Sequence, residues 1–209
     1  MKNELNIVKF FPIIILSFII WKTTYSQSIQ YAGLRSFDYY ASQQTNSNWC
    51  WAASIQMILN FYGVDITQEQ IVRRTYGTDP YGNLPNWTGN IQTVTRNLNN
   101  WNIDNRGNTY MVRALVYTGA PTPSYLIQEL NQGRPVMIGY VSGQGSGHAV
   151  VITGAYYNHT PYGPSIQTLV VRDPWPSYEN IQNKGRVEYP GSVLANRIMA
   201  HWYVRVVYL

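Results

Sequence analysis

The chain has 209 residues, of which 45% are hydrophobic and only 12% are charged, and its formal net charge is +5. This length suits one domain with a sizeable core, and the hydrophobic fraction excludes a chain that is disordered throughout. The positive charges form no run of Lys or Arg, so the composition shows no footprint of a nucleic-acid partner.

The N-terminal segment Met1–Ser26 has the pattern of a secretory signal. Two lysines give it a basic start, Phe10–Trp21 is an apolar run, and Thr24-Tyr25-Ser26 forms the small-residue exit. An uncleaved anchor is the alternative, but the apolar run is short for a membrane span. We therefore expect cleavage near Ser26–Gln27, one mature domain over 27–209 without an integral membrane part, and a secreted or periplasmic location.

The first half of the mature chain predicts helices. A polar, turn-forming stretch, Gln43–Trp49, leads into a helix from Cys50 to Tyr62 whose apolar residues recur at three- and four-residue steps and which stops at Gly63. A capping box at Thr67–Gln70 begins a short helix that ends near Gly77. A loop over Tyr76–Gly89 and a third helix over Asn90–Asn99 follow.

The second half predicts mainly strands, separated by Gly, Pro and Asn clusters. The expected strands are Met111–Tyr117, Arg134–Val141, His148–Thr153, Ile166–Arg172 and Trp202–Leu209, with one helix over Ser124–Gln132 capped by Gly133. A helical part over about 43–105 and an antiparallel β part over about 109–209 indicate an α+β fold.

Cys50 is the one cysteine of the chain, although exported domains commonly use cysteines in disulfide pairs. A buried inert thiol or an intermolecular disulfide would each explain a single cysteine. The predicted position of Cys50 at the start of a helix offers a third explanation. The helix dipole and the free N–H groups there favour a thiolate, which is the reactive form.

A reactive thiol needs a base, and the chain has three histidines. His148 opens an apolar strand directly after the Gly-rich segment Ser142–Gly147, so it would be held by fixed structure. We expect His159 to lie in a solvated hairpin loop and His201 to pack or face solvent near the start of the last strand. His148 is therefore the predicted base.

Two further residues complete the predicted site. Asp173 ends a strand that would pair with the His148 strand, so its carboxylate could orient the imidazole; a turn-forming Asp before Pro is the alternative. Gln44, six residues before the cysteine, could donate to an oxyanion together with the backbone N–H of Cys50. Gln43 is the second candidate for that role, and a plain surface glutamine is the alternative.

These residues, in the order Gln44, Cys50-Trp51, Gly147-His148-Ala-Val-Val and Asp173-Pro174-Trp175, resemble the papain-like cysteine peptidases. The finer pattern of Cys50-Trp-Ala-Ala with Gly133-Arg-Pro-Val is more similar to the C39-like peptidases and the AvrRpt2-type effector peptidases. The resemblance covers nearly the whole mature chain. Ser47-Asn-Trp49 stands where cathepsin-like enzymes carry Cys-Gly-Ser, and we expect no inhibitory propeptide of the cathepsin kind.

The resemblance implies a papain-like fold, hydrolysis of peptide bonds through Cys50, His148 and Asp173, and a thioester acyl-enzyme. It also implies a polypeptide substrate, a monomer, and neither a metal ion nor a cofactor. Trp51, Gly147 and Trp175 are expected along the substrate cleft. Two other functions stay open: an amidase acting on cell-wall peptides by the same chemistry, and a papain-like binding module without activity.

Overall fold

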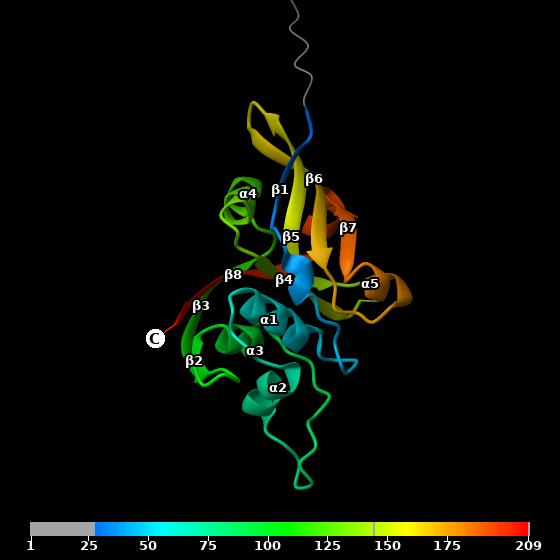
Figure 1. Cartoon of the computed structure of the whole chain (residues 1–209). Coiled ribbons are helices and arrows are strands. Elements are labelled where there is room, and N and C mark those ends of the chain that lie inside the picture. Colours follow the sequence, from blue (N-terminus) through cyan, green and yellow to red (C-terminus); the bar gives the residue numbers. More distant parts are fainter. Residues whose placement is uncertain (1–27, 144, 209) are drawn as a thin grey trace, which may run out of the picture.

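One antiparallel sheet of eight strands organises the residues that the computed structural model describes, 28–143 and 145–208 (Figure 1). The strand order is β2-β3-β8-β4-β5-β6-β7, and β1 pairs with residues 154–157 in the second half of β5. The expected signal segment Met1–Ser26 lies outside the described residues.

The strands are β1 (Gln30–Gly33), β2 (Asn100–Ile103), β3 (Thr109–Thr118), β4 (Val136–Val141), β5 (Gly147–Thr160), β6 (Gly163–Arg172), β7 (Arg186–Pro190) and β8 (Ile198–Tyr208). The helices are the 3₁₀ helix η1 (Phe37–Tyr40) and α1 (Cys50–Phe61), α2 (Gln68–Tyr76), α3 (Ile91–Asn97), α4 (Pro123–Asn131), α5 (Tyr178–Gln182) and α6 (Gly191–Ala195).

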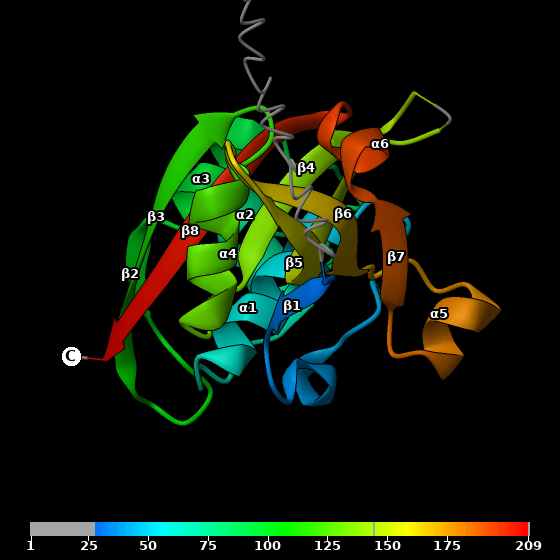
Figure 2. The same ribbon diagram turned by 90° about the horizontal axis from the view of Figure 1, so that it is seen from above.

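The two faces of the sheet bury separate apolar clusters, because successive side chains of a strand point to opposite faces. Along β5, Ala149 and Val151 pack with α1, whereas Val150 and Ile152 pack in the other cluster with residues of α4 and α6. Figures 1 and 2 show α1, α2 and α3 gathered on one side of the sheet and α4 on the other. The site described below lies where α1 meets the start of β5.

Helices α1, α2 and α3 begin and end within two residues of the predicted bounds, whereas the short helix η1 was not predicted. Helix α1 starts at Cys50 and gives way to Gly63, whose φ of +88° is the left-handed conformation that favours glycine. The capping box before α2 is present: the Thr67 side chain accepts from the Gln70 N–H, and the Gln70 side chain accepts from the Thr67 N–H. The predicted α+β architecture, with helices in the first half and an antiparallel sheet formed mainly by the second half, is confirmed.

Three strands were not predicted. Strand β2 lies inside the stretch expected to be helical and pairs with β3, while β1 and β7 add to the two sides of the β5–β6 hairpin. Strand β5 is also longer than expected, so His159 lies in that strand and not in a hairpin loop, which corrects the prediction. The hairpin closes more tightly than the sequence suggested because β6 pairs with β5 as far as Thr160 and Gly163.

Within the described residues, no helix combines the length and the apolar character needed to cross a lipid bilayer.

Candidate active site

Cys50 is the first residue of α1 and is partly exposed to solvent. The first intrahelical hydrogen bond runs from the Ala53 N–H to the Trp49 carbonyl, at 2.9 Å. The N–H groups before Ala53 therefore have no acceptor within the helix, as at any helix N-terminus. They place the positive end of the helix dipole beside the sulfur.

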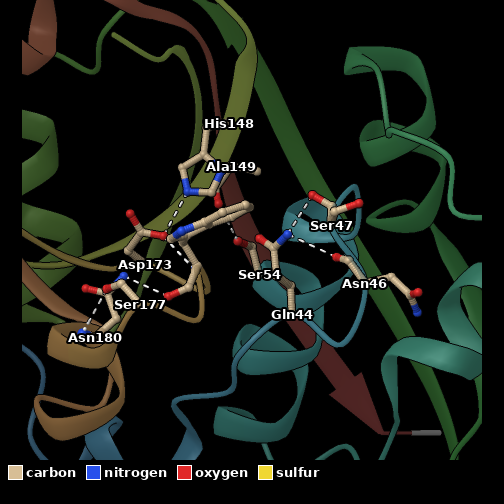
Figure 3. Close-up of polar contacts among 10 residues, drawn as sticks. Gln44, Asn46, Ser47, Ser54, His148, Ala149, Asp173, Ser177 and Asn180 are labelled. Carbon is tan, nitrogen blue, oxygen red and sulfur yellow. Dashed lines mark hydrogen bonds and ion pairs between the residues drawn. The ribbon is translucent and has the colours of Figure 1, made fainter. Parts of the chain in front are cut away.

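His148 and Asp173 come together because β5 and β6 pair antiparallel, with Val151 opposite Arg172. The His148 Nε2 lies 2.8 Å from the Asp173 Oδ1 (Figure 3). Both side chains are largely shielded, 14% and 9% exposed. Because Nε2 is engaged by the carboxylate, the second ring nitrogen is the one available to Cys50.

The electrostatics of His148 reflect this arrangement. Burial lowers its pKa, but hydrogen bonds with Asp173 and with Cys50 outweigh the burial and raise the pKa to about 9. The raised pKa favours the protonated form of the imidazole, in the cleft that Cys50 also lines.

The loop after β6 holds the Asp173 side chain in place. Its Oδ1 also accepts the Trp175 N–H at 2.8 Å, and its own N–H donates to the Gly185 carbonyl at 2.7 Å. Asn180, which is buried in α5, donates from its side chain to the Trp175 carbonyl at 2.9 Å. The carboxylate is thus fixed by the backbone around it as well as by the imidazole.

A buried hydrogen bond joins the cysteine helix directly to the histidine strand. The hydroxyl of Ser54, one turn after Cys50, donates to the Ala149 carbonyl at 3.1 Å (Figure 3). This contact sets how far α1 stands from the start of β5. It therefore bears on the distance between the sulfur and the imidazole.

Gln44 is buried in the loop before α1, and its Nε2 donates to the carbonyls of Asn46, at 3.0 Å, and Ser47, at 2.7 Å (Figure 3). Both amide hydrogens are therefore in use. Its Oε1 is buried and has no hydrogen-bond partner among the described residues. The alternative candidate, Gln43, is tied to α2, because its carbonyl accepts from the Gln68 side chain at 2.7 Å.

Cys50, His148 and Asp173 line one open cleft of about 530 Å³. Gly147 and Trp175 line it too, as the sequence predicts. Trp51 does not, which corrects the third cleft prediction: its side chain is 1% exposed, and its indole N–H donates to the Trp87 carbonyl at 3.1 Å. As the second residue of α1, Trp51 turns toward the helical side of the core.

The sequence did not identify the other cleft residues, which come from four separate segments: Ser47, Asn48, Thr88, Tyr140, Ser142, Gly143, Ser146 and Tyr189. Tyr140 could have been found by pairing the two predicted strands, because it lies directly opposite His148. The centroids of its ring and of the imidazole are 5.7 Å apart, in an edge-on arrangement. Thr88 and Tyr189 carried no local signal. They reach the cleft only through tertiary contacts.

The other two histidines lie elsewhere. His159 is exposed near the end of β5. His201 is buried in β8, its Nδ1 lies 2.7 Å from the Gly119 carbonyl oxygen, and burial lowers its pKa. Of the residues that the structure describes, no group of three or more His, Cys, Asp or Glu is arranged to hold a metal ion.

Comparison with known proteins assigns the chain to a family. The model of the Peptidase_C39 like family matches residues 36–197. No curated protein matches the chain.

Solved structures resemble it at low sequence identity. One is a double glycine motif protease from an AMS/PCAT transporter in complex with the leader peptide, with a TM-score of 0.44 and 19% identity over 78% of this chain and 87% of that chain. Another is digestive procathepsin L 3 of the Tenebrio molitor larval midgut, with a TM-score of 0.51 and 11% identity over 83% of this chain and 69% of that chain. The second likeness shows a shared fold, and the family match extends over most of the sequence. The chain therefore belongs to the Peptidase_C39 like family and is a papain-like cysteine peptidase.

Proposed function

We propose that the protein hydrolyses peptide bonds with Cys50 as nucleophile, His148 as acid and base, and Asp173 as the group that orients the imidazole. The observation that carries the proposal is the His148 ring, whose Nε2 lies 2.8 Å from the Asp173 Oδ1 in the cleft that Cys50 also lines. The open cleft around these residues leaves room for an extended peptide.

In the first half-reaction the Cys50 thiolate attacks the carbonyl carbon of the scissile bond. The tetrahedral intermediate collapses when the carbon–nitrogen bond breaks, and the His148 imidazolium gives its proton to the leaving amine. A thioester on Cys50 remains. The neutral imidazole then takes a proton from water, the hydroxide attacks the thioester, and the thiolate leaves with the imidazolium restored.

The negative oxygen of the tetrahedral intermediate needs hydrogen-bond donors. The backbone N–H of Cys50 is one, because it lies at the unpaired end of α1. Gln44 serves as the second donor in this proposal, which requires its Nε2 to exchange one of its bonds to Asn46 or Ser47 for the oxyanion. Replacement of such a donor costs about 10²–10³ in turnover in well-studied cases.

The test is the labelling of Cys50 by a thiol-directed epoxide at neutral pH. Because Cys50 is the one cysteine of the chain, labelling reports this thiol alone. His148→Ala keeps the thiol but removes its partner, so we expect labelling at least about tenfold slower than in the wild type. His159→Ala, at an exposed position away from the cleft, should label at the wild-type rate. Equal labelling of the wild type and His148→Ala would contradict the proposed pair.

We also propose that Met1–Ser26 directs export and is removed. The basic start, the apolar run and the small-residue exit support this. N-terminal sequencing of the protein recovered from outside the cytoplasm of an expressing cell should begin at Gln27. Recovery of the intact N-terminus from that fraction would contradict cleavage at this position.

A further inference from the structure

The segment Pro85–Gly89, here called the strap, runs alongside the start of the cysteine helix. Four of its successive carbonyl oxygens accept hydrogen bonds from side chains that belong to α1, α2 or the loop before Cys50. The four bonds are Trp49 Nε1 to Pro85 at 3.1 Å, Asn48 Nδ2 to Asn86 at 2.9 Å, Trp51 Nε1 to Trp87 at 3.1 Å, and Tyr76 Oη to Thr88 at 2.7 Å.

The strap also fits closely at its far end. A Cβ on Gly89 would lie 2.5 Å from the ring of Trp51, so only a glycine allows the backbone to approach the indole this closely. Because Trp51 is fully buried in the helix that begins at Cys50, the strap is attached to a fixed part of the fold.

Asn86 connects the strap to the loop that precedes the cysteine. Its Oδ1 accepts the backbone N–H of Asn48 at 3.0 Å, and its Nδ2 donates to the Ser47 hydroxyl at 2.9 Å. The residue is exposed, yet both ends of its carboxamide are bonded to two successive residues of the loop.

The same short loop is held from its other side by Gln44. The Ser47 carbonyl accepts from Gln44 Nε2, while the Ser47 hydroxyl accepts from Asn86. The peptide groups from Ser47 to Cys50 determine where the Cys50 N–H points. Asn86 and Gln44 therefore both hold the loop before α1. This loop leads into the Cys50 N–H, which is one proposed oxyanion donor, and its Ser47 carbonyl binds the Gln44 side chain, which is the other.

We infer that Asn86 is a positioning residue for the oxyanion site of this peptidase. It touches no reacting atom; it fixes the loop that aims the Cys50 N–H and anchors Gln44. Donors of this kind act only when they are held in place before the oxyanion forms. This inference rests on the proposed function, and it assigns to the strap a role in catalysis beyond the place of Thr88 in the cleft lining.

The test compares two reactions of the same thiol. Alkylation by iodoacetamide forms the carbon–sulfur bond as iodide leaves, and no oxyanion develops. Hydrolysis of a peptide substrate passes through an oxyanion. Loss of Asn86 should therefore slow hydrolysis and spare alkylation.

Three variants are measured. Asn86→Ala removes both side-chain contacts to the loop, Asn86→Asp keeps the acceptor for the Asn48 N–H but lacks the donor to Ser47, and Asn131→Ala alters an exposed asparagine on α4, remote from the cleft. We expect kcat to fall about tenfold or more in Asn86→Ala and less in Asn86→Asp, with KM and the alkylation rate within about twofold of the wild type. Asn131→Ala should match the wild type in every respect.

The protein is produced in a host without N-glycosylation, since Asn86-Trp-Thr88 is a sequon and a glycan would modify the Nδ2 that donates to Ser47. An unchanged kcat in Asn86→Ala would overturn the inference, and so would an equal loss of hydrolysis and alkylation, which would show a general disturbance of Cys50. If Asn86→Ala does not fold, Asn86→Asp carries the same comparison.

If the wild type hydrolyses no peptide, the proposed function is contradicted, but the positioning role of Asn86 can still be tested. A peptide aldehyde then serves as the probe: Cys50 sulfur bonds to its carbonyl carbon, and the thiol proton ends on the carbonyl oxygen, which occupies the oxyanion site. About tenfold weaker adduct formation by Asn86→Ala is expected. Equal adduct formation by the wild type and Asn86→Ala would overturn the inference in that case as well.

Discussion

Asp173 uses one carboxylate oxygen for two contacts, the His148 imidazole and the Trp175 N–H. An amide oxygen can accept the same bonds, whereas a methyl group cannot. We therefore expect Asp173→Asn to keep appreciable activity and Asp173→Ala to lose far more, by about tenfold or more in kcat/KM, because the imidazole loses its orientation. Equal losses in the two variants would show that Asp173 acts only as a turn residue.

The pH dependence of activity follows from His148. Burial lowers its pKa, but the bonds with Asp173 and Cys50 raise it to about 9. Activity that needs the imidazolium should fall as the pH rises through about 9. In Asp173→Asn the bond to a charged carboxylate is gone, so the alkaline limb of the kcat/KM profile should move to lower pH. If the alkaline limb stays in place in Asp173→Asn, a group other than His148 titrates in that pH range.

The same proton contributes to stability. The folded-state pKa of His148 lies above its ordinary value of 6.5, so protonation favours the folded state. This contribution is fully present below pH 6.5 and is lost as the pH rises through about 9. Thermal unfolding of the wild type should show an alkaline loss of stability in that window, and His148→Ala should lack that component.

At the scale of elements, the turn between α5 and β7 supports the strand end that carries Asp173. Gly185 has a φ of +70°, and a Cβ there would lie 2.5 Å from the Asp173 carbonyl oxygen. Gly77 has nearly the same φ, +72°, with nothing within 4 Å of the added Cβ. Alanine substitutions at the two glycines can therefore be compared to distinguish the cost of backbone strain from the cost of a collision with Asp173.

We predict that Gly77→Ala costs about 1–3 kcal/mol of unfolding free energy, because its φ of +72° and ψ of −156° lie in a region open essentially to glycine alone. Gly185→Ala should cost more, because the added Cβ also meets the Asp173 carbonyl oxygen, and it should reduce activity because Asp173 must shift. Denaturant unfolding and peptide hydrolysis measure the two effects. Equal destabilisation with unchanged activity would show that Gly185 does not support the site.

The helices of the first half and the pairing of the β5 and β6 strands were predictable because their signals are local. Apolar periodicity marks α1, and a capping box marks α2. The short strands were missed for different reasons: β1 is Gln-Tyr-Ala-Gly, with little β character, while β2 and β7 do alternate in exposure but are only four and five residues long.

At the scale of the whole molecule, the candidate site brings together residues from the helical first half and the β-rich second half of the chain. Residues from the loop before α1, the strap, β4, β5 and the turn after β6 all reach one cleft. The chemistry-bearing residues carried sequence signals: a cysteine at a helix start, and a histidine and an aspartate at strand ends. The strap contacts and the occupied Gln44 donors depend on how distant segments close on each other, so no local pattern predicted them.

Cleavage of a peptide library by the wild type and by Cys50→Ala tests the central claim most directly. If Cys50, His148 and Asp173 perform the proposed chemistry, the wild type cleaves a subset of the peptides and Cys50→Ala cleaves none above background, with both proteins folded to the same extent. Cleavage of the same peptides at equal rates by both proteins would contradict the account, as would the absence of cleavage by the wild type.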